Sequence, residues 1–192
     1  MNPQFKQAEA DWHVLRAQQG SQRSLAWLFE HFQAPALRFA LRTCWDRELA
    51  QDAVQEAWLE VAGNLRKLDD PRAFRAWLFR LVRWRALDQL RRNQRHQRGR
   101  TDVETSELSA PDTSSKLDLL EQIERLPQIE RQVIHLFYLE QCSINEIAAV
   151  IEIPVGTVKS RLHRAREQLK TILEADDAPS LRAVSTQPGD AE

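Results

Sequence analysis

The sequence predicts an all-α protein made of two helical domains joined by a flexible linker. Apolar residues recur at steps of three and four along most of the chain, which places them on one face of a helix. No run of residues favours a β-strand, and there is no internal repeat. Residues 97–115 lack this periodicity and are rich in Arg, Gln, Ser, Thr and acidic residues, which is typical of a linker.

Composition limits the classes of function. A chain of 192 residues allows one or two domains with modest cores, and the formal net charge is only -1. The charge is nevertheless segregated, because residues 72–100 contain ten Arg and one acidic residue, whereas residues 101–124 contain seven acidic residues and one Lys. This asymmetry predicts a surface for a polyanion beside a segment that avoids it.

Nothing in the sequence indicates a metal centre, a cofactor or a catalytic site. Cys44 and Cys142 lie far apart without metal-ligand spacing, so we interpret them as buried thiols in a reducing compartment. The five His show no ligand spacing, and there is no glycine-rich phosphate loop. No signal-peptide pattern opens the chain and no apolar run approaches the ~18 residues of a membrane span, so a cytoplasmic protein is expected.

The first domain is expected to begin with two helices. The first runs from about Phe5 and closes at Gly20, and the second covers residues 21–44. Pro35 lies inside this second pattern, where proline removes one hydrogen bond and clashes with the preceding turn. We therefore expect the second helix to be kinked or divided at Pro35.

The third helix is expected to start at Asp46, as its N-cap, and to run to about Leu65. Besides its apolar face it carries a second stripe, with Trp58 beside it, made of Asp52, Gln55, Glu56 and Leu59. Carboxylates and an amide around a large apolar residue can dock a partner helix, with the charges setting its orientation. The alternative is that this stripe is only the solvated face of the helix.

The fourth helix is expected from Pro71 to about Gln94, with Asp70 as its N-cap. Opposite its apolar face lie Arg72, Arg75, Arg80 and Arg83. Phe79 falls among these arginines, and Trp84 lies at their margin. Arginines with exposed aromatic rings suit a single-stranded nucleic acid, since the cations contact phosphates and the rings stack on bases. Alternatively, both aromatic rings pack against a neighbouring helix.

The second domain contains a predicted helix-turn-helix, which follows a helix over residues 128–140. Ser143 and Glu146 form a capping box at the start of a short helix, and Pro154 ends that helix. The next helix exposes Thr157, Lys159, Ser160, Arg161, His163 and Arg164. This face suits the DNA major groove, although a solvated basic face is the alternative. The tail from about Ala175 is expected to be disordered.

Two blocks of this sequence together resemble a bacterial RNA polymerase sigma factor of the extracytoplasmic-function (ECF) group of the sigma-70 family. The first block comprises DAVQEAWLEV (52–61) and FRAWLFRLVRWRALDQLRR (74–92), and the second is LPQIERQVIHLFYLEQCSINEIAAVIEIPVGTVKSRLHRAREQL (126–169). The resemblance implies a sigma-2-like domain over residues 1–96 and a sigma-4-like domain over residues 116–174. It implies a non-enzymatic protein that binds the beta-prime and beta subunits of core RNA polymerase, directs the polymerase to promoters and assists promoter melting.

The resemblance also assigns roles to residues. It implies that the beta-prime subunit docks on Asp52, Gln55, Glu56, Trp58 and Leu59. Recognition of the minus-ten promoter element is implied for the loop 64–70 and the basic helix, with Asn64, Arg80, Arg83, Trp84, Arg91 and Arg92. Recognition of the minus-thirty-five element is implied for Thr157, Lys159, Ser160, Arg161, His163 and Arg164. An anti-sigma protein is a further expected partner.

Two positions depart from the family pattern. Trp84 stands where the family usually has Asn, so contacts with the DNA strand are expected to differ there. Glu152 stands at the usual Gly of the turn in the helix-turn-helix. A positive φ at this position costs Glu on the order of 1 kcal/mol relative to Gly, which can alter the turn.

Two other functions fit parts of the sequence. A stand-alone transcriptional regulator with the same helix-turn-helix would bind a defined operator without polymerase and would dimerise. A helical metal-dependent hydrolase would use Glu30, His31, Asp52 and Glu56, and metal analysis of the purified protein would detect it.

Overall fold

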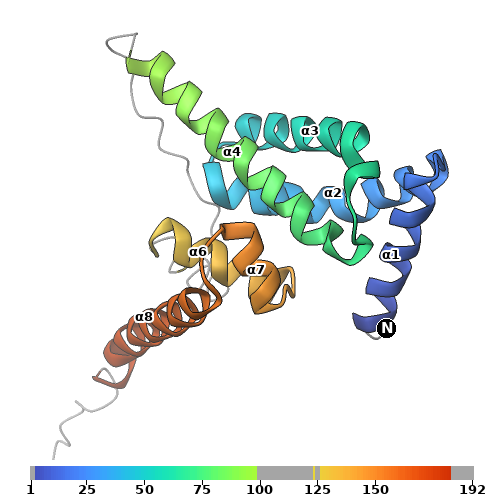
Figure 1. Ribbon diagram of the computed structural model, residues 1–192. Helices are drawn as coiled ribbons and strands as arrows, with labels where there is room; N and C mark the ends of the chain where they lie inside the picture. The colour runs from blue at the N-terminus through green and yellow to red at the C-terminus, as the bar shows by residue number, and fades with distance from the viewer. Residues whose placement is uncertain (1–2, 99–122, 124–125, 183–192) are drawn as a thin grey trace, which may run out of the picture.

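The computed structural model describes residues 3–98, 123 and 126–182, and every regular element among them is helical (Figure 1). The predicted all-α class is therefore confirmed. In chain order the elements are α1 (Pro3–Gln18), α2 (Gln22–Cys44), α3 (Arg47–Asn64), the 3₁₀ turns η1 (Leu65–Lys67) and η2 (Pro71–Ala73), α4 (Phe74–Arg98), α6 (Gln128–Ile134), the π turn η3 (His135–Leu139), α7 (Ile144–Ile151) and α8 (Val155–Arg182).

The first domain is a bundle of α2, α3 and α4, with α1 packed across one end (Figure 1). The side chains of Leu28, Phe39 and Val54 are fully buried at its centre, as the apolar periodicity predicts. Gln18 at the end of α1 ties this helix to the loop after α3. Its side-chain amide donates to the carbonyl oxygens of Leu65 at 3.0 Å and Leu68 at 2.7 Å.

Side-chain caps start three of the helical segments where the sequence places them. The Asp46 carboxylate accepts a hydrogen bond from the backbone N–H of Leu49 at 3.0 Å. The Asp70 carboxylate accepts one from the N–H of Arg72, also at 3.0 Å. At the start of α7, Ser143 and Glu146 form both hydrogen bonds of the predicted capping box. These three predictions are confirmed.

Two helices are continuous where the sequence predicts an interruption or an end. Helix α2 runs without a break through Pro35, because residues before and after it, including Phe32 and Phe39, are buried in the same core. Helix α8 continues to Arg182, beyond the expected end of the second domain at residue 174; once a helix is formed, each added residue gains a hydrogen bond at little further cost. The remainder of the predicted tail, and the predicted linker beyond α4, lie outside the described residues.

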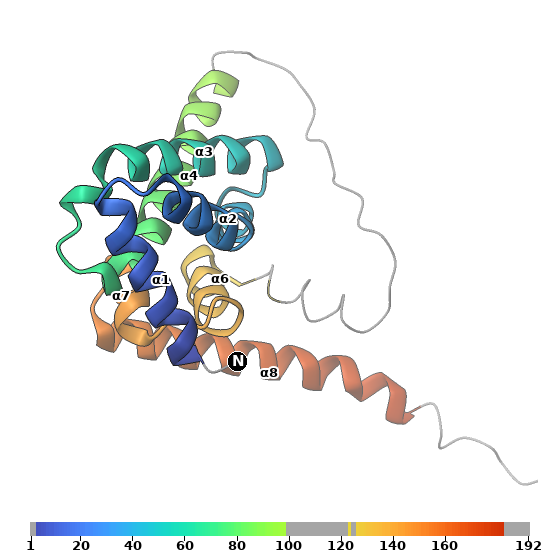
Figure 2. The same ribbon diagram turned by 90° about the vertical axis from the view of Figure 1, so that its right-hand side faces the viewer.

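The second domain packs α6, α7 and α8 around a small core (Figure 2). Val133, Ile147 and Val158 are fully buried there, one from each helix. The two domains also touch each other, because α7 packs against α4 and α6 packs against α2. The helix-turn-helix therefore lies directly against the basic helix of the first domain.

Candidate functional site

The predicted docking stripe on α3 is open to solvent over most of its length. Asp52 and Gln55 are exposed. Leu59, which lies nearer to the C-terminal end of the helix, has an exposed fraction of 68%. Glu56 is half-buried at the edge of the stripe, where its carboxylate accepts a hydrogen bond from the Gln89 side chain at 2.8 Å. An exposed leucine flanked by acidic and amide groups can insert into a partner helix surface.

Trp58 does not belong to this exposed stripe. Its side chain is only 7% exposed and packs between Phe29, at 5.1 Å between ring centroids, and Phe74, at 6.5 Å. The reason is geometric, since Trp58 lies four residues after Val54 and three before Val61, both on the buried face of α3. The Trp58 ring therefore supports the stripe from beneath, and its own contact with a partner stays a prediction.

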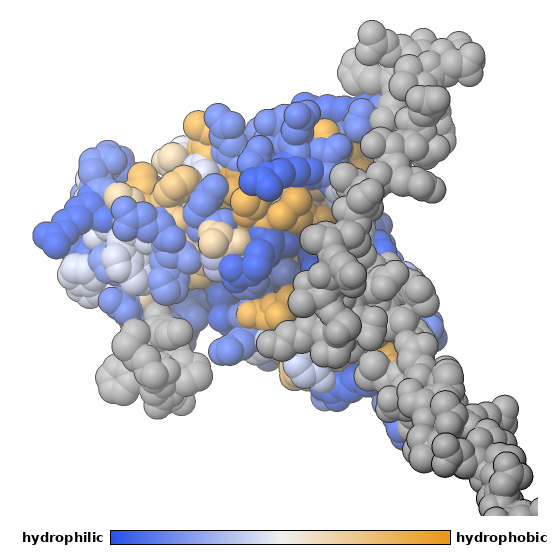
Figure 3. Space-filling view, turned by 180° about the vertical axis from the view of Figure 1, so that it is seen from behind, coloured by the Kyte–Doolittle hydropathy of each residue, from blue (hydrophilic) through white to orange (hydrophobic). Residues whose placement is uncertain are grey.

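Phe29 on α2 is a surface residue that the sequence reasoning missed. It is 43% exposed, and its ring contacts Trp58 at 5.1 Å between ring centroids. Apolar side chains also form patches within a largely hydrophilic surface on the face seen in Figure 3. Because Phe29 is partly exposed and contacts Trp58 of α3, it adds apolar area beside the α3 stripe.

The predicted minus-ten residues on α4 divide into two groups. Arg80 and Arg91 are exposed, and so is Arg92, which forms an ion pair with Asp88 at 2.6 Å. Asn64, at the end of α3, is half-buried, and its side-chain oxygen accepts a hydrogen bond from Lys67. These residues belong to the first domain alone.

Arg83 and Trp84 form the second group, because residues of the second domain contact both. The Arg83 guanidinium donates to the Gln132 side-chain oxygen at 3.1 Å, and burial lowers the pKa of Arg83. The Trp84 indole N–H donates to Glu152 at 3.1 Å, although the ring remains 56% exposed. In the present arrangement these two side chains are engaged within the protein.

Phe79 is a core residue. It is 1% exposed and packs edge-to-face on Phe39, with 5.5 Å between ring centroids. The alternative interpretation, packing against a neighbouring helix, is confirmed for Phe79, whereas Trp84 keeps an accessible ring.

The turn of the helix-turn-helix keeps the left-handed backbone that the family forms with glycine. Glu152 has φ 62° and ψ 45°, and its N–H donates to the Ala148 carbonyl at 2.9 Å to close α7. The turn is therefore not altered, and Glu152 carries strain of about 1 kcal/mol that glycine would not.

The second helix of this motif, α8, presents the predicted polar face. Lys159, Ser160, His163 and Arg164 are exposed, and Thr157 is half-buried. Arg161 differs from them because its guanidinium is paired with the Glu130 carboxylate of α6 at 2.5 Å. Arg161 therefore both braces the domain and stands on the predicted DNA face.

Glu130 is a second residue that the sequence reasoning missed. Its side chain is 1% exposed and also lies 3.9 Å from Arg164. The available signal was an acidic residue four positions before Ile134, on the buried face of α6. An acid on a buried face needs a cationic partner, and α8 supplies it.

Comparison with known proteins decides the family. The description "Sigma-70 region 2" matches residues 28–96, and "Sigma-70, region 4" matches residues 116–169. The ECF RNA polymerase sigma factor SigL of Mycobacterium tuberculosis is 37% identical over 155 residues, covering 77% of this chain and 87% of SigL. The chain belongs to the ECF group of the sigma-70 family. It is a sigma factor that directs RNA polymerase to promoters for transcription initiation.

Further relatives support the same membership. The RNA polymerase sigma-H factor of Pseudomonas aeruginosa is 30% identical over 177 residues, which is 84% of this sigma factor and 92% of the relative. Among solved structures, CnrH in complex with the cytosolic domain of CnrY is 26% identical and superposes with a TM-score of 0.65. That similarity covers 88% of this sigma factor and 99% of CnrH.

Metal-ligating side chains and the two cysteines are the other groups of the sigma factor that could carry chemistry. Within residues 3–98 and 126–182, no three His, Cys, Asp or Glu side chains are grouped so that they could hold a metal ion. Cys44 and Cys142 are both buried, as expected, and burial raises the pKa of the Cys142 thiol to about 12. In the same part of the chain, no helix is long and apolar enough to span a membrane.

Proposed function

We propose that this sigma factor docks on the beta-prime subunit of core polymerase through Asp52, Gln55, Glu56 and Leu59 on α3. The exposed stripe carries the proposal, because a leucine that is 68% exposed between acidic and amide groups is a ready docking surface. On the docked complex, α4 contacts the minus-ten element and α8 contacts the minus-thirty-five element.

The physical basis of promoter selection is the combination of two weak contacts. A protein with a net charge of -1 has little overall attraction for DNA, so each basic surface alone binds weakly. Once the protein is held on polymerase, both surfaces act on one DNA molecule, and the second contact gains from a high effective concentration. Promoter specificity then belongs to the complex and not to the free protein.

Promoter melting follows from selective binding. The exposed arginines and the Trp84 ring on α4 can hold a base that has left the stack. Such binding offsets an unstacking cost of a few kcal/mol, and no bond is made or broken by this chain. We therefore assign the chain a non-catalytic role in the cytoplasm. An anti-sigma protein, which the family resemblance implies, is also proposed as a partner, and CnrH, a structural relative, likewise binds a protein, the cytosolic domain of CnrY.

The test is run-off transcription with purified core polymerase, with and without the sigma factor, on a library of the source organism's promoter fragments. The proposal expects transcripts with defined start sites only when the sigma factor is added. Operator binding by the free protein, together with no effect on core polymerase, would instead establish a stand-alone regulator.

A further inference from the structure

The loop between α3 and α4, residues 64–70, is held by a side chain of helix α1. The side-chain amide of Gln18 donates one hydrogen bond to the Leu65 carbonyl oxygen at 3.0 Å and a second to the Leu68 carbonyl oxygen at 2.7 Å. Gln18 lies 47 and 50 residues before these two partners in the sequence. One neutral side chain thus fixes the loop backbone at two points, and these two bonds form the Gln18 clamp.

Gln18 is itself fixed in place by the way α1 ends. Gly20 has a φ of 95°, and its N–H donates to the Ala17 carbonyl oxygen at 2.9 Å. The Ser21 N–H donates to the Arg16 carbonyl oxygen at 3.0 Å. These two bonds form a Schellman motif, which closes a helix with glycine in the left-handed region. The Gln18 amide therefore reaches the loop from a well-defined helix end.

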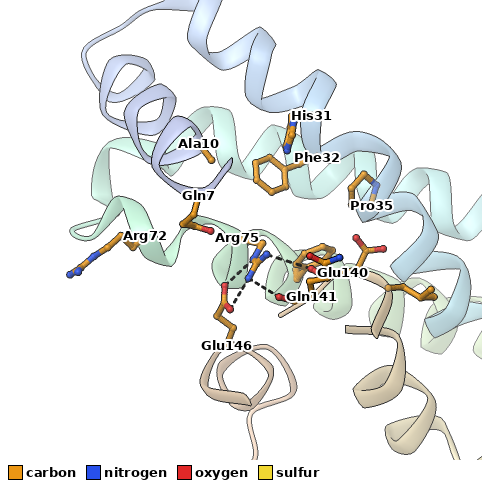
Figure 4. Close-up of a pocket in the computed structure, with 12 residues that line it drawn as sticks. Gln7, Ala10, His31, Phe32, Pro35, Arg72, Arg75, Glu140, Gln141 and Glu146 are labelled. Carbon is orange, nitrogen blue, oxygen red and sulfur yellow. Dashed lines mark hydrogen bonds and ion pairs between the residues drawn. The ribbon is translucent and has the colours of Figure 1, made fainter. Parts of the chain in front are cut away.

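Helix α1 also supports the far end of the loop. It contacts both η1, which lies in the loop, and η2, which leads from the loop into α4. Gln7 and Ala10 of α1 and Arg72 of η2 line one pocket (Figure 4). The His13 ring of α1 stacks on Trp27 of α2, with 4.0 Å between ring centroids. The loop is thus held by a helix that is itself packed on the bundle.

The side chains of the loop divide into those that anchor it and those that face solvent. Leu65 is only 4% exposed, and Leu68 is half-buried against the core. Three charged residues of the loop are exposed, namely Arg66, Lys67 and Asp69. Because Gln18 bonds to the backbone of the two leucines, the clamp fixes the course of the chain and leaves the charged side chains available to a partner.

We infer that Gln18 is a positioning residue for minus-ten recognition, because its amide holds the loop 64–70 in the shape in which the exposed loop residues meet the promoter strand. The inference rests on the proposed function, in which the first domain contacts the minus-ten element. A loop that is already ordered loses less conformational freedom on binding than a mobile one. An ordered loop also adapts less readily to a wrong base. Gln18 therefore acts on sequence discrimination through the loop, without touching DNA.

The test uses two variants of Gln18 and one matched control, all in the full chain. Gln18→Met removes both donors and keeps an unbranched side chain. Gln18→Glu keeps the shape but replaces the donors by a carboxylate, which repels the two carbonyl oxygens. Gln19→Glu places the same charge one residue further along α1, at an exposed position. The Gln19 side-chain oxygen accepts a hydrogen bond from Arg16, and a carboxylate at position 19 can accept it as well.

Amide hydrogen exchange reports whether the clamp orders the loop. The Leu68 N–H is a direct probe, since it donates to the clamped Leu65 carbonyl oxygen at 3.1 Å. We expect exchange in residues 64–70 to be several-fold faster in both Gln18 variants than in the wild type and in Gln19→Glu. Exchange in α2 and α3 should stay at the wild-type rate, which checks the fold. Equal loop exchange in all four proteins would overturn the inference.

Discrimination between DNA sequences tests the role in recognition. The complex of each variant with core polymerase is titrated with a fluorescent single-stranded oligonucleotide that carries the minus-ten sequence from the run-off experiment, and with versions changed at one base. Since one hydrogen bond contributes about fivefold to an equilibrium constant, losing both should lower the ratio of matched to mismatched affinity by that factor or more. A merely structural role would reduce the active fraction of the protein and leave this ratio unchanged.

The control separates failure of the inference from failure of the proposed function. Affinity ratios of both Gln18 variants equal to that of Gln19→Glu would overturn the role of Gln18 and leave the proposed function intact. A wild-type complex that binds matched and mismatched oligonucleotides equally would overturn the proposed minus-ten contact, and the role of Gln18 with it.

Discussion

The docking stripe of α3 and the predicted DNA surfaces of α4 and α8 differ in how ready they are for a partner. Asp52, Gln55 and Leu59 project into solvent. On the DNA surfaces, by contrast, the Arg161 guanidinium is paired with Glu130 and the Trp84 indole is bonded to Glu152. Docking through Asp52, Gln55 and Leu59 therefore uses side chains that are already exposed, whereas DNA contact by Arg161 and Trp84 must exchange internal partners for phosphates and bases. The two kinds of surface therefore differ in how many internal contacts must be exchanged when a partner binds.

The largest expected effect tests whether the α8 surface is engaged internally. Arg161→Ala leaves the buried Glu130 carboxylate without its closest cation, which costs about 2 kcal/mol after allowance for the partial exposure of Arg161. Thermal unfolding followed by circular dichroism should show a melting temperature lower by several degrees. Adding Glu130→Gln should recover part of this loss. A melting temperature equal to that of the wild type would mean that Arg161 is free for DNA.

The next effect tests whether the exposed α3 stripe binds core polymerase. Leu59→Asp places a charge where apolar contact with the partner is expected, and it should weaken core polymerase binding about tenfold, or ~1.4 kcal/mol. Folding should be unaffected, because Leu59 is 68% exposed. Ala34→Asp, which adds the same charge at an exposed position of α2, is the matched control. Fluorescence anisotropy with labelled protein measures both, and equal affinities would exclude the stripe.

The smallest effect is a pH dependence of the packing between the two domains, where Arg75 of α4 pairs with Glu146 of α7. Burial by itself raises the pKa of Glu146, but hydrogen bonds from Arg75 and Ser143 outweigh it and bring the pKa below the ordinary value of 4.5. A carboxyl with a lowered pKa stabilises the state in which the two domains are packed together, and it does so above pH 4.5. This contribution is lost as the pH falls through the lowered pKa. The radius of gyration should therefore be constant from pH 5 to 8 and rise below pH 4.5.

Glu146→Gln serves as the control for this titration, because an amide cannot titrate. Its radius of gyration should change less below pH 4.5 than that of the wild type. Parallel curves for the two proteins would show that other groups govern the acid response.

Local signals in the sequence were sufficient for the helices and their ends. Caps such as Asp46 and Ser143 act within three residues, and the positive φ of Glu152 follows from its place in the turn. The sequence was a less reliable guide to which single residues of α3 are exposed. Trp58 is buried because it falls on the core side of α3, which a count of 100° per residue already indicates.

Contacts between distant segments could not be predicted in the same way. The partner of Trp84 lies 68 residues away, and the partner of Arg161 lies 31 residues away on another helix. Periodicity identifies which face of a helix is polar, but it does not identify which polar group meets it. The continuity of α2 through Pro35 has a similar cause, since packing on both sides of the proline outweighs a local preference.

The most direct measurement compares two affinities of the wild type with those of the combined Glu146→Gln and Glu152→Gly variant. The first is the affinity for core polymerase, and the second is the affinity for the single-stranded minus-ten oligonucleotide. If the α3 stripe is open and the second domain engages Arg83 and Trp84 of α4, the variant should bind polymerase as the wild type does and bind the oligonucleotide several-fold more tightly. An unchanged oligonucleotide affinity, or a changed polymerase affinity, would contradict this difference between the two surfaces.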